Sequence, residues 1–193
     1  MSELKINGKL YQNPLFVFAM KAEAGREFDA ENCIFTGIGK LNASYYIMKG
    51  ISEKRPDIVV NLGTAGSTAF SKGEIVCCSG FYQRDMEVTV LGFQKFETPF
   101  SDEPPLLRYG IDFENVPSGI CGSGDSFEME HQNPEYNVID MEAFAFAKIC
   151  QRENIPFLCL KYISDGANDD AVSDWTYEVK KASKKLYETI YRQ

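Results

Sequence analysis

The sequence predicts a single α/β domain over residues 1–193. Short apolar runs ending in Gly, Ser or Asp recur along the chain, which is typical of strands buried on both faces. Helix-like stretches lie between several of these runs. No Pro-, Gly- or Ser-rich linker divides the chain, which is long enough for one substantial core.

Composition and charge exclude several classes of protein. The net charge is -8, and Lys and Arg are spread without clusters, which argues against a nucleic-acid surface. The apolar runs are far shorter than the roughly 20 residues that span a bilayer, and the N-terminal MSELKINGKLY lacks the apolar core of a signal peptide. We therefore expect a cytoplasmic protein whose partner is a small molecule or a second copy of itself.

Nothing in the sequence predicts a metal or a cofactor. The six cysteines form no C-x-x-C pair and mostly lie in apolar runs, as free core cysteines do in a reducing compartment. His131 is the only histidine and lies in a polar stretch, which disfavours a zinc site or a Ser-His-Asp triad. Gly37-Ile38-Gly39 suggests a tight turn or close backbone approach, but it is too short for a dinucleotide fingerprint.

The N-terminal third predicts alternating strands and a helix. Leu15–Met20 reads as a buried strand, and Glu23 lies just beyond its end. A carboxylate there suits a reacting group, although the first turn of a helix favours one for its dipole alone. Cys33–Thr36 predicts the next strand and Leu41–Lys54 a helix.

The middle of the chain predicts further strands. Asp57–Gly63 is a strand that ends in small residues, whose exposed amides either line a pocket or form an ordinary turn. Glu74–Gln83 and Met86–Phe93 are both rich in β-branched and aromatic residues and predict two strands. Glu97–Pro105 reads as a loop that covers a site or crosses the surface.

Two later stretches place polar residues beside apolar ones. Ser118–Phe127 passes from a short apolar core into a loop, and Phe127 either stacks on a flat ligand or fills the core. Val138–Cys150 predicts a helix that is apolar nearly all round. Asp140 and Glu142 lie at its beginning and need partners, because an isolated buried charge is costly.

The most informative stretch is Phe157–Asp170, an apolar strand that stops at Ser164-Asp165-Gly166. In an open α/β sheet, ligands bind at the carboxyl ends of the strands, so Asp165 is placed to present a reacting group. The alternative is that Asp165 only caps a turn, which its neighbours Gly166 and Asn168 permit. An amphipathic helix over Ser173–Gln193 closes the chain and is expected to pack one side on the sheet, carrying Trp175, Val179, Leu186 and Ile190.

Taken in order, these stretches resemble a known family. The motifs are AMKAEAG, FTGIGKLNAS, VNLGTAGS, RDMEVTVLGF, SGDSF, VIDMEAFAFAKIC and KYISDGAND. They are similar to the purine nucleoside phosphorylase and nucleosidase superfamily, in particular its 5'-methylthioadenosine/S-adenosylhomocysteine nucleosidase branch. The resemblance implies a three-layer α/β/α fold with a twisted, mixed central sheet, assembled as a homodimer. It also implies a small-molecule purine nucleoside as the ligand.

The resemblance assigns roles at the base. Asp165, in the matching Ser-Asp, is implied to be the general acid that protonates N7 of the purine, with Ser164 placing it. Phe127, at the end of SGDSF, is implied to stack on the base.

It assigns further roles at the sugar. Glu142, preceded by Met141, is implied to accept hydrogen bonds from the ribose hydroxyls, and Glu23 to hold and deprotonate the attacking water. Hydrolysis of an N-glycosidic bond needs both an acid for the leaving group and a base for water, and separated carboxylates supply both.

Departures from the family pattern keep other functions open. Lys21 and Ala22 replace two acids of the usual AMEEE, and Ile139-Asp140 replaces Val-Glu. The chain is also short for the branch, so a different 5' substituent, as in futalosine, stays possible. A phosphorylase would need cations for phosphate, but Asn61 and Glu23 stand where phosphorylases usually carry arginines. A non-catalytic nucleoside-binding module is the third alternative.

Overall fold

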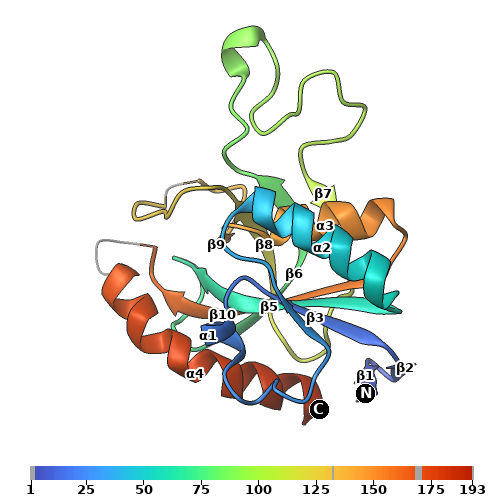
Figure 1. Ribbon diagram of the computed structural model, residues 1–193. Helices are drawn as coiled ribbons and strands as arrows, with labels where there is room; N and C mark the ends of the chain where they lie inside the picture. The colour runs from blue at the N-terminus through green and yellow to red at the C-terminus, as the bar shows by residue number, and fades with distance from the viewer. Residues whose placement is uncertain (1–2, 132, 168–170, 193) are drawn as a thin grey trace.

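The computed structural model describes residues 3–131, 133–167 and 171–192. Asn168 to Asp170, which end the KYISDGAND motif, and Gln193, which ends the predicted C-terminal helix, lie outside the described residues. The architecture is a mixed eight-stranded sheet between two layers of helices, as the resemblance implied (Figure 1). Within the described ranges, no helix is both long enough and apolar enough to cross a bilayer.

A parallel group of strands forms one half of the sheet. β5 (Ile58–Gly66) pairs with β3 (Pro14–Phe18) on one side and with β10 (Phe157–Asp165) on the other, and β3 pairs with β4 (Cys33–Phe35). All residues of β3 and β10 are buried, which explains why both appear as mainly apolar runs. The strands predicted around Leu15, Cys33, Asp57 and Phe157 are therefore confirmed.

The other strands curl the sheet back on itself. β6 (Ile75–Gln83) runs antiparallel to β10 and parallel to β8 (Ser118–Ser123), which is parallel to β9 (Val138–Asp140). A single pairing of Gly66 with Ile139 joins β9 to β5 and closes a ring of five strands. The two-residue β7 (Leu107–Arg108) adds to the edge of β6.

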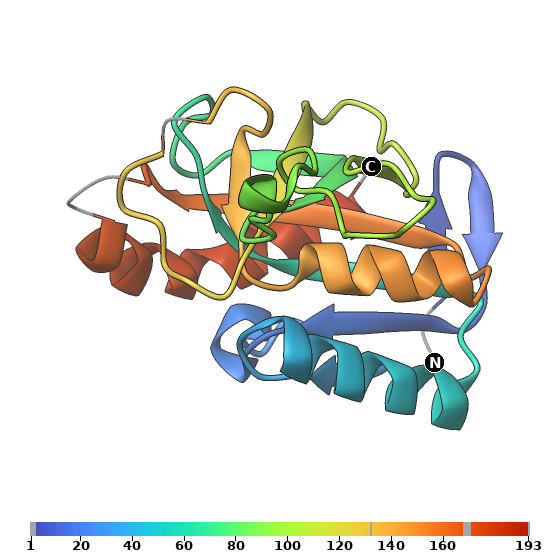
Figure 2. The same ribbon diagram turned by 90° about the horizontal axis from the view of Figure 1, so that it is seen from above.

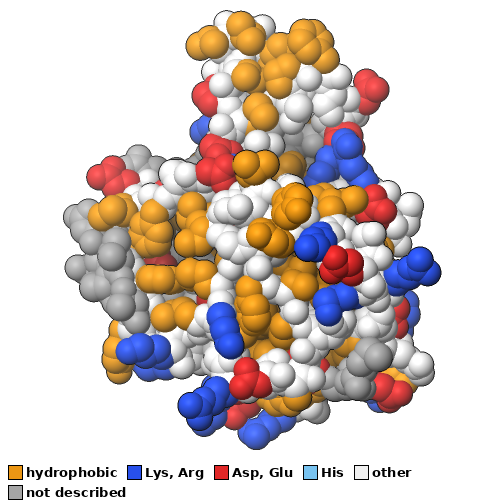
Figure 3. Space-filling view, in the orientation of Figure 1, with side chains coloured by type: hydrophobic (Ala, Val, Ile, Leu, Met, Phe, Trp, Pro, Cys, Tyr) orange, Lys and Arg blue, Asp and Glu red, His pale blue; other side chains and the backbone are white. Residues whose placement is uncertain are grey.

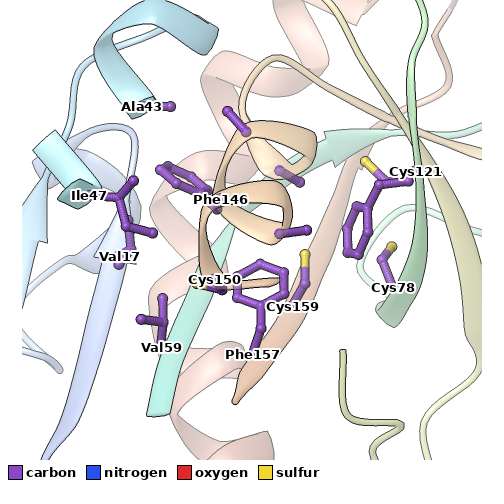
Figure 4. Close-up of a cluster of buried hydrophobic side chains, with 14 of the residues drawn as sticks. Val17, Ala43, Ile47, Val59, Cys78, Cys121, Phe146, Cys150, Phe157 and Cys159 are labelled. Carbon is purple, nitrogen blue, oxygen red and sulfur yellow. The ribbon is translucent and has the colours of Figure 1, made fainter. Parts of the chain in front are cut away.

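Helices cover the two faces of the sheet. α2 (Lys40–Lys54) and α3 (Ala143–Arg152) pack together on one face, while α1 (Lys21–Ala24) and α4 (Ala171–Tyr191) cover the other (Figures 1 and 2). Each face has its own apolar core. Figure 4 shows the α2 and α3 side, where aromatic and aliphatic side chains from both helices and the sheet interlock.

The cysteines and the C-terminal helix agree with expectation. All six cysteines are free, and five of them are buried, so they serve as small core residues. On α4, Val179, Leu186 and Ile190 are buried against the sheet. A two-stranded hairpin of β1 (Leu4–Ile6) and β2 (Lys9–Tyr11) lies outside the main sheet.

One predicted helix begins later than expected. Val138–Asp140 is the strand β9, and the helix starts only at Ala143. The residues from Val138 are apolar enough for either structure, and the pairing of β9 with β8 and β5 decides for a strand. Asp140 therefore ends a strand, and Glu142 is the residue that precedes the first helical position.

The predicted strand over Met86–Phe93 is wrong. This stretch holds turns and a single 3-10 turn at Thr89–Leu91, within a long segment between β6 and β7 that projects from the body (Figure 1). Val90 is 92% exposed. β-branched residues favour a strand where a neighbouring strand can pair with it, and no described strand pairs with this segment.

Candidate active site

A cavity of about 300 Å³ lies at the carboxyl ends of β5 and β10, beside the segments that follow β3, β4, β8 and β9. All six residues singled out from the sequence line it: Glu23, Phe127, Met141, Glu142, Ser164 and Asp165. These residues come from four separate parts of the chain, so the fold brings the predicted set together. Their chemical roles remain predictions.

Asp165 is held at the end of β10 with both carboxylate oxygens engaged. The Ser164 hydroxyl donates to Oδ2 at 2.9 Å, and the Ala167 N–H donates to Oδ1 at 2.9 Å. The second bond is the turn cap that the alternative interpretation expected, so Asp165 caps a turn and also lines the cavity. A Cβ at Gly66 would lie 2.7 Å from Oδ1, so a larger residue there would displace the Asp165 carboxylate.

Glu23 lies in the four-residue helix α1 and is 4% exposed. Its Oε1 accepts hydrogen bonds from the Thr64 N–H at 2.8 Å and the Thr64 hydroxyl at 2.9 Å, while Oε2 accepts the Met20 N–H at 3.1 Å. The Trp175 indole N–H donates to the same hydroxyl at 3.1 Å. These contacts hold the carboxylate in one orientation at the cavity wall.

Glu142 is a buried carboxyl beside a second one. Its Oε1 accepts the backbone N–H of Gly39 at 2.9 Å. The pKa of Glu142 is raised to about 8, first by burial and next by the nearby Asp140 carboxylate, while Lys161 and the Gly39 N–H act in the opposite direction. A carboxyl that titrates near neutral pH can both donate and accept hydrogen bonds, as the hydroxyls of a sugar require.

Asp140 and Lys161 form a buried ion pair behind Glu142. Their charged atoms are 2.8 Å apart, and both side chains are at most 3% exposed. Burial alone would raise the pKa of Asp140, but the Lys161 ammonium holds it below its ordinary value. Burial likewise acts to lower the pKa of Lys161, and Asp140 raises it well above the ordinary value. Asp140 also accepts hydrogen bonds from the Ser123 hydroxyl and from the Ala143 N–H at the start of α3.

Phe127 is 46% exposed, so it does not fill the core. It lines the cavity together with apolar side chains that include Met20, Ile38 and Ile139. Such a lining suits a flat aromatic ligand.

Other sequence candidates lie away from the cavity. Asn61 is buried within β5, where it donates to the Val17 carbonyl, so its identity does not decide how a phosphate would bind. Glu97–Pro105 does not line the cavity. The His131 ring lies between Glu128 and the Tyr136 carbonyl. No group of three or more His, Cys, Asp or Glu in the described part of the chain is arranged to hold a metal ion.

Several lining or supporting residues had no assigned role in the sequence. Thr64 lies in the small-residue stretch that was open to either interpretation, and Gly39 in the Gly-x-Gly that suggested a close backbone approach. Trp175 was expected only to pack on the sheet. No pattern in the sequence indicated Glu128.

Comparison with known proteins identifies the family and the fold. The sequence model of the Phosphorylase superfamily matches residues 31–192, and the chain belongs to that family. It is 29% identical over 175 residues to the 5'-methylthioadenosine/S-adenosylhomocysteine nucleosidase of Staphylococcus epidermidis. The alignment covers 80% of this chain and 77% of that protein.

Two solved structures from Helicobacter pylori share the fold. A 5'-methylthioadenosine/S-adenosylhomocysteine nucleosidase superposes with a TM-score of 0.83 at 16% identity, covering 94% of this chain and 97% of that one. A futalosine hydrolase superposes with a TM-score of 0.82 at 15% identity, covering 92% and 95%. At this identity the likeness concerns the fold.

Proposed function

We propose that this protein hydrolyses the N-glycosidic bond of a purine nucleoside, releasing the base and a 5'-substituted ribose. The observation that carries the proposal is the placement of Asp165 and Glu23. Their carboxylates line the same cavity and are held by separate hydrogen bonds. Among the described residues, no Lys or Arg lines this cavity. One carboxyl can serve the leaving base, and the other can serve the attacking water.

In the proposed mechanism, three carboxyl side chains have separate roles. Asp165 supplies a proton to N7, which lets the purine leave as a neutral base while positive charge develops on the sugar. Glu23 takes a proton from a water molecule that adds to the anomeric carbon, so the C–N bond is replaced by a C–O bond. Glu142 binds the ribose hydroxyls. Each acid or base role is typically worth about 10² to 10⁴ in rate.

The substrates to test first are 5'-methylthioadenosine and S-adenosylhomocysteine, from which adenine would be released. Their choice rests on the relative from S. epidermidis. The futalosine hydrolase of similar fold supports futalosine as the alternative. The apolar lining near Met20 and Ile38 is compatible with an uncharged thioether substituent.

Product analysis with and without inorganic phosphate tests the proposal. The expected products are free base and reducing sugar, at a rate that does not depend on phosphate. A sugar 1-phosphate as the main product, or a requirement for phosphate, would establish a phosphorylase. Tight binding of nucleosides without turnover would establish a binding module.

We also propose that two copies of the chain associate as a homodimer. The exposed face of α2 carries apolar side chains one and two turns apart, and the projecting segment ends in further apolar side chains (Figure 3). They are Leu41, Tyr45 and Met48 on α2, and Val90, Leu91 and Phe100 on the segment. Sedimentation equilibrium should give twice the chain mass, and Leu41→Glu with Tyr45→Glu should lower it. A monomer at all concentrations would refute the proposal.

A further inference from the structure

One wall of the cavity is an irregular segment, residues 124–131, between β8 and β9. Ser126, Phe127 and Glu128 of this segment line the cavity. It forms no helix or strand over these residues, so no backbone ladder holds it in place. Backbone hydrogen bonds hold its two ends, from the Gly124 N–H to the Asp140 carbonyl and from the His131 N–H to the Ala167 carbonyl, so the position of Phe127 between them depends on side-chain contacts.

Arg84 is the main anchor. It follows β6, and its side chain is 7% exposed. One terminal nitrogen, Nη2, donates to the carbonyls of Gly124, at 3.4 Å, and Ser126. The other, Nη1, lies 3.1 Å from both the Ser126 hydroxyl and the Glu128 carboxylate. The fixed fork of a guanidinium can hold several acceptors at once, which a single ammonium cannot.

The packing around Arg84 is close. A Cβ at Gly124 would lie 2.9 Å from the Cγ and Cζ atoms of Arg84, so the guanidinium lies directly against the backbone of the segment. Its Nε–H is buried without an acceptor among the described residues. A buried donor left unpaired is costly, which indicates that the contacts of the terminal nitrogens determine where the side chain lies.

Other groups complete the anchorage. Asp85, the next residue, accepts the Asp125 N–H at 2.9 Å. Glu128, which accepts from Arg84, also lies 3.0 Å from the His131 ring, and the other ring nitrogen lies 3.0 Å from the Tyr136 carbonyl. Each end of the segment is therefore fastened, and Phe127 lies between the two sets of contacts.

We propose that Arg84 is a positioning residue for the base, because it holds residues 124–131 so that Phe127 forms a preformed stacking wall. Arg84 does not itself line the cavity. The proposal rests on the proposed function, in which a purine occupies this end of the site. Stacking on an aromatic side chain contributes to the binding of a base. Loosening the wall should therefore weaken binding of the base by about tenfold.

The test compares Arg84→Met with Arg84→Lys and with a matched control. Lys148→Met removes another partly buried cation and its contact with Glu103, away from the cavity. Hydrogen exchange of residues 124–131 is measured in the absence of ligand, with β5 as the internal reference for folding. The dissociation constant of free adenine is measured by calorimetry, and KM and kcat with the nucleoside that is turned over.

Arg84→Met should speed exchange in 124–131 while β5 stays protected, and should raise the adenine dissociation constant and KM by about tenfold with a smaller effect on kcat. For Arg84→Lys, the exchange rates, the adenine dissociation constant and KM should lie between those of Arg84→Met and wild type. For Lys148→Met, all three should match wild type. Unchanged exchange in 124–131 would overturn the proposal whatever the ligand, and so would faster exchange with unchanged adenine binding. Wild-type protein that binds neither adenine nor nucleosides would instead refute the proposed function, and with it the role of Arg84 at the base.

Discussion

Replacing Glu142 by Gln should stabilise the ligand-free protein, and increasingly so as the pH rises. In the folded protein the pKa of the Glu142 carboxyl is about 8, whereas its ordinary pKa is 4.5. Between these values the folded state binds one more proton than the unfolded state. The free energy of unfolding therefore falls as pH rises through this window, by about 1.4 kcal/mol per pH unit. This stabilisation is fully present below about pH 4.5 and lost above about pH 8.

The glutamine variant lacks this titration, and its amide oxygen can still accept the Gly39 N–H. Between pH 5.5 and pH 7.5, its stability relative to wild type should rise by about 2 to 3 kcal/mol. For a domain of this size, that difference corresponds to roughly 5 to 10 °C in Tm. Above about pH 8, where the wild-type carboxyl is ionised, binding of ribosides to the variant should weaken by about 1.5 to 3 kcal/mol, because a charged acceptor is lost.

Urea denaturation of both proteins at several pH values measures the effect. Glu53→Gln is the control, because Glu53 lies on α2 with its side chain 59% exposed. A stability difference between Glu142→Gln and wild type that is constant with pH would refute the reasoning about burial. A loss of stability with unchanged riboside affinity would show instead that Glu142 has a purely structural role.

Three further substitutions test the other charged groups. Asp165→Asn should lower turnover of an adenine nucleoside by at least about 10² in a folded protein, and near-normal turnover would refute its role as the acid. Glu23→Gln should remove most sugar release but leave inhibitor binding largely intact, whereas a parallel loss of binding would contradict a role confined to the water. Lys161→Met should destabilise the fold by about 3 to 5 kcal/mol, because it leaves the Asp140 carboxylate buried without its cation. Adding Asp140→Asn should recover part of this loss in urea denaturation, and no recovery would show that the ion pair is not its cause.

The sequence alone was sufficient to predict the elements whose signal is local. Mainly apolar runs identified β3, β5 and β10, because strands buried on both faces need apolar side chains at most positions. The carboxylates that follow such runs, Glu23 and Asp165, could be proposed from position alone. Their assignment to an acid and a base came from the resemblance to a family.

Tertiary structure decided everything that depends on a partner distant in the chain. β9 could not be told from a helix start until β8 and β5 paired with it, and Met86–Phe93 has strand-forming residues but no partner strand among the described residues. The raised pKa of Glu142 likewise depends on burial and on Asp140, and its contact with Gly39 spans 103 residues. The local sequence determines backbone propensities and the side chains that are present. The burial of a side chain, the pairing of a strand and the neutralisation of a charge depend on which residues are brought together by the fold.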